Sequence, residues 1–178
     1  LKDNDKVLER GKELLDNIKG SWNKVFFKNN FPIVLEVGCG KGEYTIGLAE
    51  KFPKKNVIGV DIKGPRIYHG LKYATDYQMD NVGFLRTQVL LLADVFEKGE
   101  VDEIWLTFPD PRPLEGDEKR RLFSPRFLTL YKQILRSGGV LNLKTDDSNL
   151  YGYSLALSKK LGLRVYAATN DLYESGHQ

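Results

Sequence analysis

Short apolar runs alternate with longer amphipathic segments along the chain. The runs are rich in Val, Ile, Leu and aromatic residues, as strands buried on both faces of a parallel sheet should be. We therefore predict strands at residues 33–37, 56–60, 82–86, 101–108, 140–144 and 163–169. The intervals predict helices at residues 43–52, 65–78, 89–97, 125–136 and 148–161. This alternation predicts an α/β fold with a doubly wound sheet, whose ligand sites lie beyond the carboxyl ends of the strands.

A further amphipathic segment precedes the first strand. We predict a helix over residues 2–19, followed by the linker "GSWNKVFFKNNFP". The chain is thereby divided into residues 1–31, the N-terminal helix and linker, and residues 32–178, the sheet domain.

The helix at 125–136 has recognisable ends. Ser124 followed by Pro125 fits an N-cap residue and a proline in the first turn. Gly138 and Gly139 fit the end of the same helix, so we expect the next strand to begin directly after them.

Composition narrows the class of protein. The chain has 178 residues, 41% of them hydrophobic, enough for one domain with a sizeable core. No stretch approaches the roughly 18 apolar residues that span a bilayer, and the start has no signal-peptide core. The single cysteine, Cys39, cannot form an internal disulfide, so we expect a cytoplasmic protein. Neither His69 nor His177 has neighbours at metal-ligand spacing, so no metal site is expected.

Neither the net charge nor the sequence pattern identifies the partner or the oligomeric state. A net charge of +3 is too small to identify a nucleic-acid partner, because many ordinary enzymes carry as much. The pattern does not distinguish a monomer from a homodimer.

A glycine-rich loop, "EVGCGKGEY", follows the first strand and places Glu36, Gly38, Gly40 and Gly42 at alternate positions. Glycine lets the backbone turn sharply and lets a ligand approach without meeting a Cβ. The spacing is not the G-x-G-x-x-G of dinucleotide-binding enzymes. The carboxylates of Glu36 and Glu43 disfavour a phosphate and favour a ligand with a cationic end, such as S-adenosylmethionine. Glu43 could equally serve only to complement the helix dipole.

Two further residues follow strand ends. Asp61 comes 21 residues after Gly40 and could accept hydrogen bonds from both hydroxyls of an adenosine ribose. This role fits NAD and S-adenosylmethionine equally. Gln88 follows the third strand, where its side-chain carbonyl could meet an adenine amino group, or where it could simply start a helix.

The stretch "FPDPRPLEGDEKRRL" follows the fourth strand. Pro109 and Pro111 restrict the backbone around Asp110, so this carboxylate is presented in a preset direction. The "KRR" block and Arg126 lie beside the same strand end, where they could make salt-sensitive contacts with RNA phosphates. An ordinary exposed run of charges is the alternative for this block.

These residues resemble the tRNA (guanine-N7-)-methyltransferases, a family often called TrmB. The resemblance spans roughly residues 32–153 and rests on the ordered motifs "EVGCGKG", "GVDI", "FPDP", "KRRL", "SPRFL" and "LKTDDSNLYGY". It implies a Rossmann-like class I methyltransferase sheet of seven strands, S-adenosylmethionine as cofactor and tRNA as partner. The implied reaction is methyl transfer to N7 of a guanine, conventionally guanine 46 of the variable loop. Because a seventh strand is not seen, we expect the protein to have a further C-terminal segment.

Together with the patterns above, the resemblance assigns roles to individual residues. Asp110 is expected to be catalytic and to lie between cofactor and guanine. The residues expected to bind the cofactor are Glu36, Gly38, Gly40, Asp61, Gln88 and Asp110. The residues expected to bind tRNA are Arg112, Lys119, Arg120, Arg121, Thr145 and Asp146.

The chain departs from the family pattern after "FPDP". The family usually continues with Trp, then His or Pro, and then Lys, whereas this chain has Arg112, Pro113 and Leu114. A substrate-contacting lysine is therefore missing at Leu114, and Arg112 is a candidate to supply the positive charge. Gln88 replaces an acid of many relatives. The late Thr-x-Tyr-Glu motif of the family is not matched by "TNDLYESGHQ".

Other functions share some of these sequence features with a tRNA methyltransferase. An NAD-dependent oxidoreductase would share Asp61 but would require G-x-G-x-x-G. A methyltransferase for a small molecule or another RNA would share the loop, and the small-molecule enzyme would have no use for the "KRR" block. A non-catalytic RNA-binding protein would keep that block without needing Glu36 or a rigid Asp110.

Overall fold

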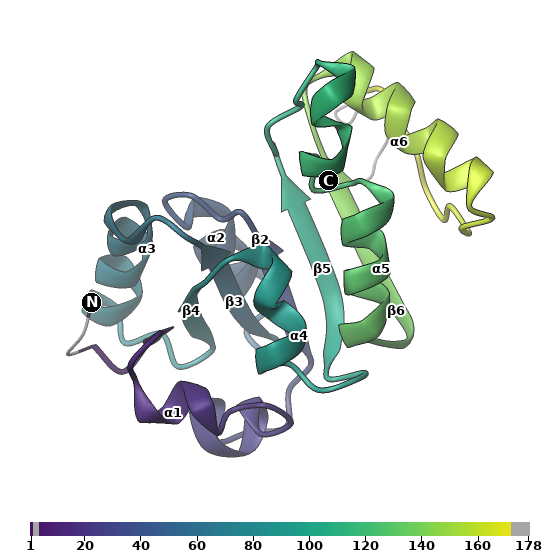
Figure 1. Cartoon of the computed structure of the whole chain (residues 1–178). Coiled ribbons are helices and arrows are strands. Elements are labelled where there is room, and N and C mark those ends of the chain that lie inside the picture. The colour runs from purple at the N-terminus through teal and green to yellow at the C-terminus, as the bar shows by residue number, and fades with distance from the viewer. Residues whose placement is uncertain (2–3, 172–178) are drawn as a thin grey trace.

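The computed structural model describes residues 1 and 4–171 (Figure 1). Its centre is a parallel sheet with the strand order β1-β4-β3-β2-β5-β6. The strands are β1 (Val7–Glu9), β2 (Ile33–Val37), β3 (Asn56–Asp61), β4 (Val82–Arg86), β5 (Val101–Thr107) and β6 (Leu135–Lys144). The doubly wound α/β fold predicted from the alternating pattern is confirmed.

Helices connect the strands, as predicted. They are α1 (Glu13–Asp16), α2 (Glu43–Lys51), α3 (Gly64–Asp76), α4 (Leu92–Val95), α5 (Pro125–Ile134) and α6 (Ser148–Lys160). Shorter helical turns are η1 (Trp22–Phe27), η2 (Val89–Leu91) and η3 (Glu115–Arg120). The predicted helix at 89–97 is divided between η2 and α4.

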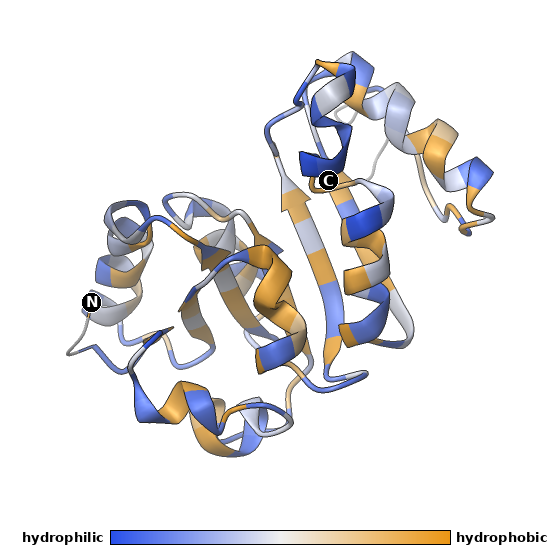
Figure 2. Cartoon of the chain, in the orientation of Figure 1, coloured by the Kyte–Doolittle hydropathy of each residue, from blue (hydrophilic) through white to orange (hydrophobic). Residues whose placement is uncertain are grey.

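The sheet separates two apolar cores. Side chains of successive strand residues point to opposite faces, so Val34 packs on one face while Leu35 packs on the other. Helices α2 and α3 cover the first face, and α4, α5 and part of the N-terminal segment cover the second. Figure 2 shows the central strands largely orange and the charged turn η3 blue. The molecule is thus a three-layer sandwich. Because all its strands are parallel, their carboxyl ends lie along the same side of the sheet.

Residues 2 and 3 of the predicted helix over residues 2–19 lie outside the described part of the chain, and the rest of this prediction is wrong over most of its length. Val7–Glu9 forms β1, which pairs in parallel with β4, and only Glu13–Asp16 is helical in this segment. The edge of β4 offers unpaired backbone groups, and Val7 and Leu8 become fully buried by pairing there. Ile18 and Trp22 then fill the second core, where the Trp22 ring stacks on Phe96 with centroids 4.9 Å apart.

The predicted strand at 163–169 is also wrong. After α6 this segment has no strand structure, and Leu163, Val165 and Tyr166 are exposed. A strand needs a neighbour to satisfy its backbone groups, and in the described part of the chain β6 forms the edge of the sheet without one on its outer side. The described sheet therefore has six strands with β1 included.

Gly138 and Gly139 do not end a helix. Helix α5 ends at Ile134 and β6 begins at once, with the two glycines inside an irregular stretch of its pairing with β5. Gly138 has φ 77°, and a Cβ on Gly139 would lie 3.1 Å from the carbonyl oxygen of Asp102. The glycines allow this close approach of two strands.

Candidate active site

The glycine loop is tied to the neighbouring strand. The amides of Gly38 and Cys39 both donate to the carbonyl of Val60, at 2.8 and 3.0 Å. The loop therefore sits above the carboxyl ends of β2 and β3, which is where a doubly wound sheet places its ligands.

The glycines in this loop serve different purposes. Gly40 has φ 56°, and a Cβ built on it would meet nothing within 4 Å, so open space lies over its backbone. Gly42 has φ 78° and caps α2, but a Cβ there would lie 2.8 Å from the Phe84 ring and 3.3 Å from Gly70 Cα. Gly40 thus leaves room for a ligand, whereas Gly42 allows α2 and α3 to pack closely.

Asp61 links the loop to the end of β3. Its Oδ2 accepts from the Gly40 amide and its Oδ1 from the Lys63 amide, both at 2.9 Å. A carboxylate offers about four lone-pair sites, so each oxygen can still accept a ribose hydroxyl. The carboxylate is therefore held in a defined direction beside Gly40.

Glu36 is a buried carboxylate, 2% exposed, on the same sheet face as α2. One oxygen accepts from the hydroxyl of Thr45 in α2, and the other accepts from the hydroxyl of Thr107 in β5. Burial raises the pKa of Glu36, while the two hydroxyl donors act in the opposite direction and nearby Asp61 adds to the rise. The site thus keeps an acidic group in a low-dielectric position beneath the glycine loop.

Cys39 does not have the environment of a nucleophile. The thiol is buried, and burial, followed by the charges of Glu36 and Asp61, raises its pKa well above the ordinary value of 9.0. A reactive cysteine needs a lowered pKa.

Asp110 is fixed by Arg112. The Arg112 amide donates to Asp110 Oδ1 at 3.1 Å, and Arg112 Nε lies 3.0 Å from Oδ2. Arg112 adopts φ 46°, a left-handed conformation that is uncommon for a non-glycine residue. The Asp110 side chain is 63% exposed. The carboxylate is therefore both oriented and open to a ligand, and the cation of Arg112 is already engaged with it.

The basic block is organised by a tyrosine of α6. The Arg121 guanidinium lies 4.4 Å from the ring centroid of Tyr153, whose hydroxyl donates to Glu118 at 2.8 Å. Burial and Glu118 raise the pKa of Tyr153 to about 12. Arg120 pairs with Asp117 at 3.0 Å.

Lys119 differs from its neighbours in this block. It is exposed and has no hydrogen-bond or ion-pair partner among the residues that the structure describes. Of the three basic residues, it is therefore the cation most available to a phosphate.

The remaining predicted site residues lie near the same edge of the sheet. In "KTDD", Asp147 caps α6 through the Leu150 amide at 2.7 Å, and Thr145 Oγ1 accepts from the Asp147 amide at 3.1 Å. Asp146 lies between them in the chain and is exposed. Gln88, at the start of η2 after β4, and Leu114, before η3, are also exposed. The capping contact assigns a structural role to Asp147 and leaves Asp146 open.

Three residues at this edge were not expected from the sequence. Tyr44, Phe108 and Lys144 come together from α2, the end of β5 and the end of β6. They lie far apart in the chain, and no spacing signal joins them.

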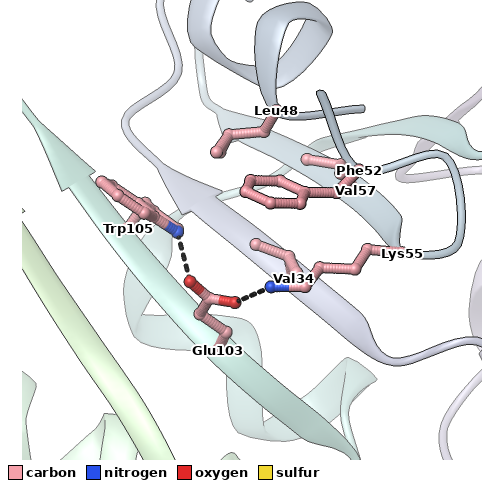
Figure 3. Close-up of a pocket in the computed structure, with 7 residues that line it drawn as sticks. All are labelled: Val34, Leu48, Phe52, Lys55, Val57, Glu103 and Trp105. Atoms are coloured by element: carbon pink, nitrogen blue, oxygen red, sulfur yellow. Dashed lines mark hydrogen bonds and ion pairs between the residues drawn. The ribbon is translucent and has the colours of Figure 1, made fainter. Parts of the chain in front are cut away.

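A hollow away from the carboxyl ends of the strands lies between β2, β5 and the end of α2 (Figure 3). Glu103 is central to it: one carboxylate oxygen accepts from Lys55 Nζ at 2.8 Å, and the other accepts from Trp105 Nε1 at 2.8 Å and Asn142 Nδ2 at 3.0 Å. Val34 pairs with Glu103, well before the strand ends. Both carboxylate oxygens of Glu103 are thus already engaged by side chains of the protein.

The strand-end residues fit S-adenosylmethionine. The open space over Gly40, the oriented carboxylate of Asp61 and the buried acid of Glu36 suit a ligand with a ribose and a cationic end. No group of three or more potential metal ligands occurs among the described residues. No described helix has both the length and the apolar character needed to cross a membrane.

Solved structures share this fold. The antibiotic-resistance methyltransferase Kmr matches with a TM-score of 0.51 at 21% identity, over 65% of this chain and 57% of that chain. Geranyl diphosphate C-methyltransferase from Streptomyces coelicolor A3(2), solved with S-adenosyl-L-homocysteine, matches with a TM-score of 0.52 at 16% identity, over 75% and 48%. These matches show that the chain has the fold of these methyltransferases.

Sequence comparison narrows the class to a family. The profile of the family described as "Putative methyltransferase" matches residues 30–177. A tRNA (guanine-N(7)-)-methyltransferase of Christiangramia forsetii is 49% identical over 92% of this chain and 74% of its own length. One from Porphyromonas gingivalis is 50% identical, over 89% of this chain and 64% of its own length. The chain belongs to this family of methyltransferases, among the members named tRNA (guanine-N(7)-)-methyltransferase.

Proposed function

We propose that the protein transfers a methyl group from S-adenosylmethionine to N7 of a guanine in tRNA. The observation that carries the proposal is the oriented and exposed carboxylate of Asp110, which follows a strand beside the glycine loop and precedes a turn that ends in the basic residues Lys119 and Arg120. The names of relatives at 49% and 50% identity support the same substrate. Within tRNA, the family resemblance favours guanine 46 of the variable loop. Because tRNA and cofactor meet in the cytoplasm, we place the protein there.

The cofactor would be held at the loop. The residues we assign to it are Glu36, Gly38, Gly40, Asp61, Gln88 and Asp110. Bound S-adenosylmethionine supplies an electrophilic methyl group on a sulfonium. Glu36 would balance its positive charge, Asp61 would accept hydrogen bonds from the ribose hydroxyls, and Gly40 would admit the cofactor without a Cβ in the way.

The proposed methyl transfer requires no general base. Guanine N7 carries an in-plane lone pair and no proton at neutral pH, so no residue has to remove one. Asp110 would accept hydrogen bonds from the N–H groups of the base and hold N7 in line with the methyl group. Positioning of this kind supplies up to about 7–11 kcal/mol in favourable cases. The carboxylate also tolerates the positive charge that moves onto the purine.

The tRNA backbone would contact the basic residues at the end of η3. The residues we assign to tRNA are Arg112, Lys119, Arg120, Arg121, Thr145 and Asp146. Arg112 acts here mainly through Asp110, because its guanidinium is paired with that carboxylate. Lys119 is exposed and available to a phosphate.

The test is methyl transfer from labelled S-adenosylmethionine to bulk tRNA, with the product mapped by mass spectrometry. We expect 7-methylguanosine from the parent protein. For Asp110→Ala we expect a loss of about 10-fold to 100-fold, as for removal of a charged hydrogen bond. Asp80→Ala is the matched control, since Asp80 is a 97% exposed aspartate two residues before β4, at the amino end of that strand and not at the carboxyl ends. An Asp110→Ala protein that binds cofactor and methylates tRNA like the parent would refute the assignment.

A further inference from the structure

Lys144 lies at the carboxyl end of β6 with its ammonium group against aromatic side chains. Nζ donates to Tyr44 Oη at 2.5 Å and lies 5.1 Å from the centroid of the Tyr44 ring and 5.7 Å from that of Phe108. No carboxylate in the described part of the chain pairs with it. An ammonium carries three donors, so two remain for a ligand.

Phe108 is held exposed in an uncommon conformation. Its φ is 47°, and its side chain is 52% exposed at the end of β5. Its amide donates to the Lys144 carbonyl at 2.7 Å, and its ring meets Tyr44 edge to face at 6.5 Å. Keeping a bulky residue in the left-handed region costs about 1–3 kcal/mol, which points to a function for the exposed ring. A fixed, exposed aromatic ring is a platform on which a base can stack.

The cluster of Tyr44, Phe108 and Lys144 lies close to both the glycine loop and Asp110. Thr107, which precedes Phe108, donates to Glu36 beneath the glycine loop. Asp110 follows two residues later. Tyr44 is the second residue of α2, directly after the loop. A base held by Asp110 would therefore have Phe108 and Lys144 within the same surroundings.

Resting on the proposed function, we infer that Tyr44, Phe108 and Lys144 form the subsite that selects guanine. Lys144 donates to O6 of the base, and Phe108 stacks on its face. Guanine presents the acceptors O6 and N7 side by side, whereas adenine presents an amino donor in place of O6. An ammonium has donors only, so it binds O6 and rejects the adenine amino group. Asp110 takes the N–H groups of the opposite edge, and N7 stays free to attack the methyl group.

The test removes each partner of the Lys144–O6 contact in turn. The target guanine, mapped first with the parent protein, is replaced by 2-aminopurine. This base keeps N7 and the 2-amino group but lacks both O6 and the N1 hydrogen, so Asp110 loses one donor equally in the parent and in the Lys144 variant. On guanine, Lys144→Met should lower kcat/KM by about 10-fold to 100-fold, the range for a charged hydrogen bond. On 2-aminopurine, the same variant should change kcat/KM by less than about 2-fold, because the acceptor is already absent. Equal losses on both bases would overturn the inference.

Two further variants separate edge reading from stacking. Lys144→Arg keeps donors without acceptors and should retain the part of the preference for guanine over 2-aminopurine that Lys144→Met loses. Phe108→Leu should lower kcat/KM by about 10-fold or more on both bases alike, because stacking does not depend on the base edge. Loss of the guanine preference in Lys144→Arg, or an effect of Phe108→Leu on guanine alone, would contradict the assignment. Lys51→Met, which removes an exposed lysine 5.9 Å from the Phe52 ring, is the matched control and should behave like the parent.

Calorimetry with S-adenosylhomocysteine tests the rival ligand, the cofactor carboxylate. We expect Lys144→Met to bind it with the parent affinity, and a loss of 10-fold or more would assign Lys144 to the cofactor and overturn the inference. Failure of the proposed function would look different, because the parent protein itself would then form no 7-methylguanosine in tRNA.

Discussion

Replacement of Thr107 by valine tests how the charge of the buried Glu36 carboxylate is stabilised. Thr107→Val keeps the shape of the side chain and removes the hydroxyl that donates to Glu36. A hydrogen bond to a charged group is worth about 1.5–3 kcal/mol. For a domain of 150–250 residues, 1 kcal/mol shifts the melting temperature by about 2–4 °C, so we expect a decrease of about 3–12 °C near neutral pH.

The pH dependence of this decrease identifies its cause. Burial raises the pKa of Glu36 above its ordinary value of 4.5, so the folded protein binds the proton more tightly than the unfolded chain. The free energy of unfolding therefore falls as pH rises from about 4.5 through the folded pKa. Removing the Thr107 hydroxyl raises that pKa further and enlarges the fall. The difference between Thr107→Val and the parent should thus be larger at about pH 8 than at about pH 5.

Thermal unfolding followed by circular dichroism at both pH values measures the effect. Thr129→Val is the matched control, because the Thr129 hydroxyl is exposed and donates only to the Pro125 carbonyl of its own helix. It should stay within about 0.5 kcal/mol of the parent at both pH values. A Thr107→Val decrease that is the same at both pH values would refute the role given to the Glu36 charge.

Two other features of the structure yield predictions. Gly42→Ala should lose about 1–3 kcal/mol more stability than Gly40→Ala in thermal unfolding, because only at Gly42 does the added Cβ meet Phe84. Gly40→Ala should instead lose more affinity for S-adenosylhomocysteine in calorimetry. Equal stability losses for the two variants would contradict these separate roles. Lys119→Gln should lower the slope of log affinity for tRNA against log salt by about 0.7–0.9, the value of one phosphate contact. Filter binding over a salt series measures the slope, and Lys160→Gln, at the exposed end of α6, should leave it unchanged.

Local patterns predicted the central strands and the loop well. The five runs from 33–37 to 140–144 became β2 to β6, and Asp110 is exposed at a strand end as expected. Near-continuous apolar runs are typical of parallel strands buried on both faces, and β2 is buried at every position.

Sequence patterns predicted the structure less well where a helix and a strand would bury the same residues. Val7 and Leu8 fit an amphipathic helix or an edge strand, and only the free edge of β4 decided for the strand. The run at 163–169 has strand composition but no partner in the described sheet. Gly42 looked like part of the ligand loop, but it serves the packing of α2 on α3.

The sequence by itself determined the class of fold, the glycine loop beside Asp61 and the rigid carboxylate of Asp110, since each depends on residues close together in the chain. The tertiary structure alone decided what surrounds them. Thr107 reaches Glu36 across 71 positions, and Lys144 reaches Tyr44 across 100. Such contacts arise when the sheet aligns its strand ends, and no local periodicity reports them, because periodicity records only which face of its own element a residue occupies.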